Sequence, residues 1–202
     1  MGFDEGAMIE PLVVAVHAVR QAGDVKSLKI AVLGAGPIGI LVAQAAKGMG
    51  AQSVMITDIS DVRLKEAKEC GADFCVNTKE KDFGEAMLEN FGPDKADVIY
   101  DCAGNNVTMG QAIKYARKGS IIILVAVFSG MAVLNDHELD LNTTMMYRNK
   151  DYLKGIKLVD EGKVALTPLI SKHFSFKEYL KAYQYIDENK ETTMKVIINV
   201  QE

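Results

Sequence analysis

Short apolar runs alternate with longer amphipathic stretches between residues 28 and 148. A short continuous apolar run is typical of a strand buried on both faces, whereas apolar residues at helical spacing indicate a helix with one buried face. The pattern predicts strands at 30–33, 53–57, 74–76, 97–100, 121–127 and 140–147. It predicts helices between them at 37–49, 61–70, 82–91 and 108–117. This alternation favours an α/β fold with a doubly wound parallel sheet of about six strands.

The two ends of the chain depart from this alternation. The opening stretch predicts a helix with Pro11 in its first turn and Gly23 at its end. Beyond Arg148 we expect amphipathic helices at 151–161 and 176–188, and an isolated strand at 195–200 that has no sheet of its own to join. We therefore divide the chain into a connecting helix (1–24), a sheet domain (25–148) and a C-terminal segment (149–202).

The turn after the first strand carries the glycine spacing G-x-G-x-x-G. Gly34 allows a tight turn, Gly36 lets the backbone approach a pyrophosphate, and Gly39 allows the helix to lie close to the strand. Pro37 fits the first helical turn, where a missing N–H costs nothing. The helix N-terminus would then face a pyrophosphate. This arrangement predicts a Rossmann dinucleotide-binding domain, the alternative being a turn of the same shape without a ligand.

An acidic residue ends the second predicted strand. Asp58 follows Gly39 at the distance where a carboxylate binds the adenosine ribose hydroxyls. Its charge would repel the additional phosphate of NADP, and no basic residue follows before Arg63. The sequence therefore favours NAD as the cofactor.

Composition excludes several classes of function. A net charge of −4 provides no basic field for nucleic acid or anionic lipid. No apolar run reaches membrane-spanning length, and the first ten residues lack the basic region of a signal peptide, so we expect a cytoplasmic protein without a membrane partner. The three cysteines (Cys70, Cys75 and Cys102) predict free thiols rather than a disulfide framework or a closed zinc site.

With these features in place, the chain resembles the zinc-dependent medium-chain dehydrogenases, and within them the sorbitol (L-iditol) dehydrogenase branch. The resemblance rests on Glu10-Pro11, GAGPIG, Asp58 and Tyr147-Arg148. It extends through the segments GAMIEPLVVAVHAVR, ITDISDVRL and GKVALTPLISKHFSF. It implies an NAD-dependent polyol or secondary alcohol dehydrogenase, in which hydride passes from a zinc-bound alcohol to NAD. The alcohol itself stays open, because relatives act on sorbitol, L-iditol, xylitol, butanediol and threonine.

The resemblance also assigns residues to the cofactor. It implies that Ile38 joins the glycine turn around the pyrophosphate and that Arg63 lies beside the ribose, although Arg63 equally fits a solvated helix position. The remaining expected contacts come from the ends of the fourth and fifth strands, with Phe128 equally able to close the end of the sheet. They are Cys102, Ala103 and Gly104 near the adenine, and Val125, Val127 and Phe128 near the nicotinamide.

One departure from the family concerns the metal. Members carry an N-terminal catalytic domain with the zinc-binding cysteine and histidine, and here no cysteine or histidine precedes His17. Glu10 is the one counterpart of the family's metal site, as a ligand or a partner of the metal-bound water, and a single carboxylate cannot hold catalytic zinc. We therefore expect this chain alone to bind no zinc and to be inactive. By the same resemblance Arg148 could hydrogen-bond a polyol hydroxyl, or it could be a surface arginine.

Other functions share part of this sequence pattern. A stand-alone NAD(H)-binding or sensing module would share the whole glycine and Asp58 pattern, and a threonine or butanediol dehydrogenase relative would share the fold. A short-chain dehydrogenase is excluded because no tyrosine has lysine four residues later. Nothing in the sequence favours a methyltransferase. The resemblance further predicts a homodimer or homotetramer, paired through a sheet edge near residues 130–134.

Overall fold

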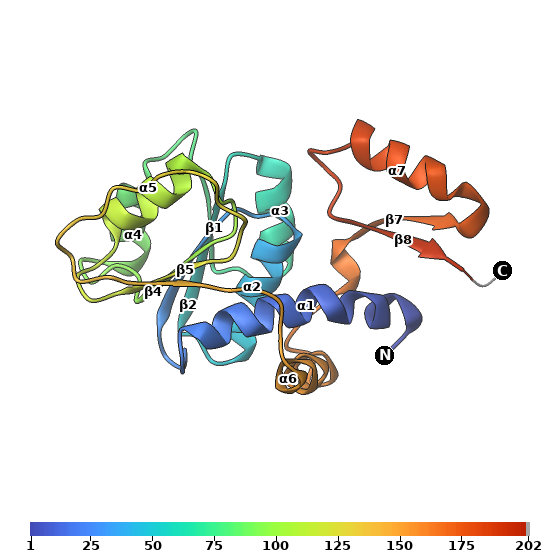
Figure 1. Ribbon diagram of the computed structural model, residues 1–202, viewed down its shortest axis with the longest axis horizontal. Helices are drawn as coiled ribbons and strands as arrows, with labels where there is room; N and C mark the ends of the chain where they lie inside the picture. The colour runs from blue at the N-terminus through green and yellow to red at the C-terminus, as the bar shows by residue number, and fades with distance from the viewer. Residues whose placement is uncertain (201–202) are drawn as a thin grey trace.

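A six-stranded parallel sheet forms the centre of the computed structural model, which describes residues 1–200 (Figure 1). The strands are β1 (Lys29–Leu33), β2 (Ser53–Asp58), β3 (Phe74–Asn77), β4 (Val98–Asp101), β5 (Ile121–Leu124) and β6 (Asp140–Thr143). Their order across the sheet is β3-β2-β1-β4-β5-β6, and every neighbouring pair is parallel. This is the strand order of the Rossmann fold, and it confirms the predicted class.

Helices cover both faces of this sheet. The alternating side chains of β1 divide the core, because Ile30 and Val32 contact one buried cluster while Ala31 and Leu33 contact the other. One face is covered by α1 (Phe3–Gln21), α2 (Pro37–Gly48), α3 (Asp61–Glu69) and α6 (Asn149–Asp160). The opposite face is covered by α4 (Phe83–Phe91) and α5 (Asn106–Tyr115). Apart from α1, these helices lie close to their predicted positions.

The N-terminal helix starts earlier than its proline suggested. We expected Pro11 in the first turn, but α1 begins at Phe3, and Pro11 lies buried well inside the helix. The physical reason is the acidic first turn, in which the Glu5 carboxylate accepts a hydrogen bond from the Gly2 N–H (2.8 Å) and starts the helix. Glu10 is therefore an exposed mid-helix residue rather than an N-terminal one.

The last two strands of the sheet are shorter than predicted. β5 ends at Leu124, because the Val125 N–H makes the last ladder bond, to the Asp101 carbonyl, and the Ala126 N–H donates to that same carbonyl instead of extending the strand. β6 ends at Thr143 rather than at residue 147 and forms the edge of the sheet. Residues 130–134, where we expected the pairing edge, lie in the irregular connection between β5 and β6, and pairing between copies stays a prediction.

The C-terminal segment contains a strand that the sequence pattern did not reveal. β7 (Ile170–Ser175) pairs in parallel with β8 (Lys195–Asn199), and α7 (Tyr179–Glu188) connects the two strands along the chain (Figure 1). The expectation of an isolated final strand is therefore wrong. Residues 149–169 instead pack on the main domain, where Leu158, Leu166 and Leu169 join the buried cluster around α1 and α2. Residues 201–202, the end of the predicted segment, lie outside the described residues.

One side chain fastens the start of this segment to the main domain. The Gln44 amide donates to the Ala165 carbonyl (3.0 Å) and accepts from the Ala165 N–H (2.7 Å). Within residues 1–200, no helix is both long and apolar enough to cross a membrane.

Candidate functional site

The glycine turn between β1 and α2 has three distinct environments. Gly34 has a φ of +98°, and a Cβ there would lie 3.2 Å from Ala103. A Cβ at Gly39 would lie 1.9 Å from the Gly34 carbonyl oxygen, so only glycine permits this approach of helix to strand. A Cβ at Gly36 would meet no atom within 4 Å. The turn is therefore tightly packed at Gly34 and Gly39 and open at Gly36.

Helix α2 begins directly after the open position, Gly36. Gly36 is the N-cap and Pro37 the first helical residue, and within the described chain no side chain caps the helix. The first turn holds no acidic residue. Amide groups without a side-chain acceptor, together with the helix dipole, favour an anion at this position.

Asp58 ends β2 next to the glycine turn. One carboxylate oxygen accepts the Ala35 N–H (2.7 Å), and the other accepts those of Ile59 (2.8 Å) and Ser60 (3.0 Å). An ionised carboxylate has about four acceptor sites. Three are occupied, so one remains for a hydroxyl group. The backbone of the glycine turn and of the residues after β2 thus holds the half-buried Asp58 side chain in place.

Arg63 points toward the C-terminal segment. Its guanidinium donates from Nη2 to the Lys190 carbonyl (3.0 Å), which ties α3 to the turn before β8. The arginine is half-buried, so it is not the freely solvated helix residue that was one alternative. Its place beside a ribose stays a prediction.

The turn after β4 lies against the glycine turn. The Cys102 N–H donates to the Leu33 carbonyl (2.9 Å), and the Ala103 Cβ would be 3.2 Å from a Cβ at Gly34. Burial and the Asp101 carboxylate raise the pKa of the half-buried Cys102 thiol, which therefore stays neutral. The predicted residues Cys102, Ala103 and Gly104 thus form one wall beside the turn.

The chain after β5 divides the three residues predicted there. Val125 is half-buried against the α1/α2 cluster, and Phe128 is half-buried against the α4/α5 cluster. Val127 is 89% exposed. Phe128 therefore packs at the end of the sheet, and Val127 is the most accessible of the three for a ligand.

Glu10 and Tyr147, far apart in sequence, come together. A hydrogen bond with Tyr152 and the nearby Glu10 carboxylate raise the pKa of Tyr147 to about 12. The rings of Tyr147 and Tyr152 meet edge to face at 5.2 Å between centroids. The exposed Arg148 is the N-cap of α6. The structure thus joins the two segments that the family resemblance assigned to the substrate side.

A buried carboxylate that sequence reasoning missed connects α1 to α6. Asp151 accepts from Arg20 Nη1 (2.5 Å) and from the Arg148 N–H (2.7 Å), and it contacts His17 Nδ1 at 2.8 Å. Burial alone would raise the pKa of Asp151, but the hydrogen bonds from Arg148, Arg20 and His17 lower it. His17 is a satisfied core histidine, and no sequence pattern marked its partner 134 residues away.

The other histidines also have structural contacts. His173 Nε2 lies 2.9 Å from the Asp4 carboxylate, and the His137 ring contacts Asn135. The three cysteines are free. Within residues 1–200, no group of three or more His, Cys, Asp or Glu side chains is placed to hold a metal ion. The donor set of this part of the chain therefore does not fit catalytic zinc, with Glu10 the single candidate proposed.

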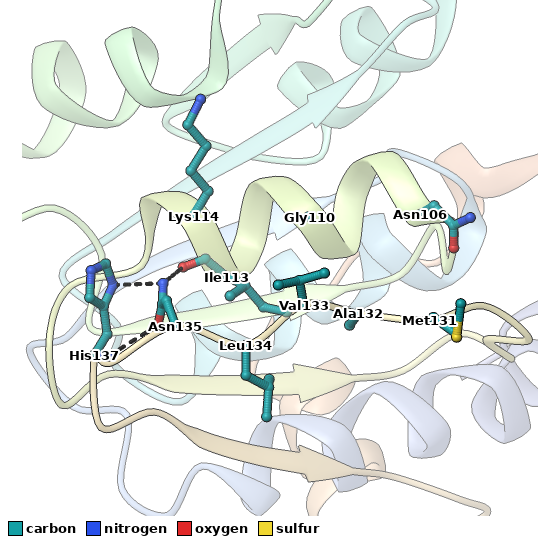
Figure 2. A pocket seen from close by; sticks show the side chains of 10 residues that line it. All are labelled: Asn106, Gly110, Ile113, Lys114, Met131, Ala132, Val133, Leu134, Asn135 and His137. Atoms are coloured by element: carbon teal, nitrogen blue, oxygen red, sulfur yellow. Dashed lines mark hydrogen bonds between the residues drawn. The ribbon is translucent and has the colours of Figure 1, made fainter.

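A groove of about 520 Å³ lies between α5 and residues 131–137 (Figure 2). Asn135 donates to the Ile113 carbonyl across its floor (2.8 Å). Met131 and Val133 on its rim are 92% and 89% exposed. None of the lining residues belongs to the glycine turn or to the predicted cofactor set. We therefore regard this groove as a surface next to the sheet edge rather than as the cofactor site.

Comparison with known proteins decides the family. Residues 37–161 match the family described as zinc-binding dehydrogenase. The chain belongs to this family. Its fold and relatives identify it as the cofactor-binding portion of these dehydrogenases.

Two curated relatives of this chain are dehydrogenases named for small alcohols. Sorbitol dehydrogenase 1 of Saccharomyces cerevisiae is 32% identical over 189 residues, covering 88% of this chain and 53% of that protein. The (R,R)-butanediol dehydrogenase of Neisseria gonorrhoeae is 32% identical over 203 residues, covering 97% of this chain and 57% of that protein. The chain therefore spans little more than half the length of these relatives.

One similar solved structure contains a bound cofactor. It is described as a short chain alcohol dehydrogenase from Escherichia coli CFT073 complexed with NADH, and it is 26% identical with a TM-score of 0.87. The match covers 96% of this chain and 59% of that one. The zinc-binding dehydrogenase fold of this chain is thus shared with a protein that binds NADH.

Proposed function

We propose that this chain is the cofactor-binding part of an NAD-dependent polyol or secondary alcohol dehydrogenase of the sorbitol (L-iditol) 2-dehydrogenase type. The observation that carries the proposal is the open side of the glycine turn at Gly36, which faces the uncapped start of α2. When bound, a nicotinamide cofactor accepts hydride from the alcohol carbon. The residues of this chain hold and orient that cofactor.

The pyrophosphate would lie above Gly36, at the start of α2. Pro37 has no N–H to leave without a partner, and the Ile38 and Gly39 amides follow in the first helical turn. The helix dipole favours the negative charge of the pyrophosphate. Both the space and the electrostatics of the turn therefore support a dinucleotide.

Asp58 would bind the adenosine ribose with its remaining acceptor site. Its negative charge disfavours the additional phosphate of NADP, and Arg63, the nearest basic candidate in the sequence, donates to the Lys190 carbonyl. These contacts support NAD over NADP. We propose that Cys102, Ala103 and Gly104 flank the adenine side and that Val125, Val127 and Phe128 lie toward the nicotinamide.

We propose that Glu10 and Arg148 lie on the substrate side. Glu10 contacts Tyr147, which directly precedes Arg148. Glu10 would face a metal-bound water or the metal, and Arg148 would donate to a polyol hydroxyl. Since the donors within residues 1–200 do not form a metal site, we derive no metal-dependent step from this chain.

Titration of the purified chain with NADH tests the proposal through the enhancement of nicotinamide fluorescence. We expect saturable binding of NADH and markedly weaker binding of NADPH. Absence of NADH binding by the folded chain would refute the proposal, and equal affinity for NADPH would refute the cofactor preference.

The alternative of an NAD(H)-binding or sensing module predicts the same binding, so substrate must separate the two. Full-length proteins that contain this chain should oxidise sorbitol, L-iditol, xylitol, butanediol or threonine with NAD if the dehydrogenase proposal holds. Binding of NADH without oxidation of any of these alcohols would favour the sensing module.

A further inference from the structure

Asp101 occupies the centre of the sheet's carboxyl edge. It is the last residue of β4, is fully buried, and lies in register with Leu33 of β1 and Leu124 of β5. The sequence pattern at the end of the fourth strand assigned Asp101 no role. A buried aspartate at this place needs partners, because a carboxylate without them is costly in the interior.

The Asp101 carboxylate has three donors, all from the chain that follows it. Oδ1 accepts the N–H groups of Ala103 (3.0 Å) and Gly104 (3.0 Å), and Oδ2 accepts the Thr108 hydroxyl (3.2 Å). The side chain thus closes a turn over residues 102–104 and fastens that turn to the first turn of α5. Burial raises the pKa of Asp101, and the same hydrogen bonds lower it in part.

The turn held by Asp101 supports both neighbouring segments. Ala103 packs against Gly34, where an added Cβ would already be only 3.2 Å away. Gly104 has a φ of +65°, and a Cβ there would lie 2.5 Å from Ala126 and 3.0 Å from the Val127 carbonyl oxygen. A displacement of this turn would therefore move against the glycine turn on one side and the chain after β5 on the other.

We infer that Asp101 is a positioning residue for the cofactor: its carboxylate fixes the turn that sets the spacing between the glycine turn and the end of β5. The inference rests on the proposed function, since those two segments are the proposed walls of the NAD site. What matters is an acceptor for the Ala103 and Gly104 N–H groups. A negative charge is not required, and the neutral amide of asparagine offers the same carbonyl oxygen.

Variants of Asp101 test the inference on the full chain by NADH titration. Asp101→Asn keeps the acceptor and should bind NADH within about threefold of wild type, whereas Asp101→Ala should bind about tenfold or more weakly. Asp82→Ala is a matched control, because Asp82 also accepts two backbone N–H groups (Gly84 and Glu85) and one hydroxyl (Tyr115). Its bonds cap α4, away from the proposed site, so its NADH affinity should equal that of wild type.

Each outcome decides the inference. Rescue by asparagine together with loss in alanine supports it, because asparagine restores the acceptor that the inference invokes while removing the charge. Wild-type affinity in a folded Asp101→Ala variant would overturn it while leaving the proposed function intact. If alanine prevents folding, Asp101→Ser takes its place, since its hydroxyl closes the same turn more weakly and should give an intermediate affinity; wild-type affinity there overturns the inference equally. Failure of wild type itself to bind NADH would overturn both the inference and the proposed function.

Discussion

Replacement of Gly36 by alanine separates ligand binding from folding at the glycine turn. Gly36 has a φ of −73° and a ψ of 178°, a conformation open to any residue, and its added Cβ meets no atom within 4 Å. The protein should therefore accept the methyl group. A pyrophosphate placed above the turn should not, because the methyl group would occupy the space through which phosphate approaches the backbone.

The magnitude follows from the contacts that the methyl group would prevent. Stability should change by no more than about 1 kcal/mol, since alanine is a weaker N-cap than glycine but reduces the entropy of the unfolded chain. Loss of one hydrogen bond to a charged phosphate is worth about 1.5–3 kcal/mol. The Kd for NADH should therefore rise roughly 10- to 140-fold.

The assay compares Gly36→Ala with Gly39→Ala by thermal melting and by NADH titration. At Gly39 the added Cβ would lie 1.9 Å from the Gly34 carbonyl oxygen, so backbone must move and stability should fall by about 1–3 kcal/mol. We expect the first variant to melt like wild type and bind poorly, and the second to melt early. Wild-type NADH affinity in Gly36→Ala would show that no phosphate lies above this turn, and the proposed site would be wrong.

Three further predictions concern other parts of the structure. Asp58→Ala should weaken NADH binding by about 1.5–3 kcal/mol while changing NADPH binding less, which parallel titrations would show; unchanged affinity for both removes Asp58 from the site. Asp151→Asn should cost about 3 kcal/mol in denaturant unfolding at pH 7, because Asp151 is buried and paired with His17 and Arg20. Folding lowers the pKa of Asp151, so this stabilisation is present above the unfolded-state pKa of about 4 and is lost as the pH falls through the folded-state pKa. The difference in unfolding free energy between wild type and Asp151→Asn should therefore shrink at low pH. A constant difference down to about pH 3 would contradict the assignment. Finally, the exposed edge strand β6 and the apolar rim of the neighbouring groove predict a homodimer or a larger assembly, so sedimentation of a clean monomer at micromolar concentration would count against it.

The sheet and its glycine turn could be predicted because their determinants are local. Continuous apolar runs marked the central strands, and the spacing of Gly34, Gly36 and Gly39 marked the turn whose packing the structure shows. The acidic residue at the end of β2 was found in the same way. Each of these features lies within a few residues of the pattern that reveals it.

The missed features depend on partners that are distant in sequence. β7 reads ISKHFS, a strand without a fully buried residue whose parallel partner follows only after α7. Asp151 resembles any polar residue at the start of a helix until His17 and Arg20 are placed beside it. Asp101 did have a local signal, an aspartate at a strand end with glycine three residues later, which is typical of a side-chain-closed turn.

The bond between α1 and α6 has a consequence for the order in which the protein matures on the ribosome. His17 and Asp151 are 134 residues apart, and at roughly 5–20 residues per second the ribosome needs about 7–27 s to synthesise the chain between them. Val19 can meet the Tyr100 hydroxyl earlier, since that pair is separated by 81 residues. During the remaining interval the face of α1 that α6 later covers stays open to solvent and to other molecules.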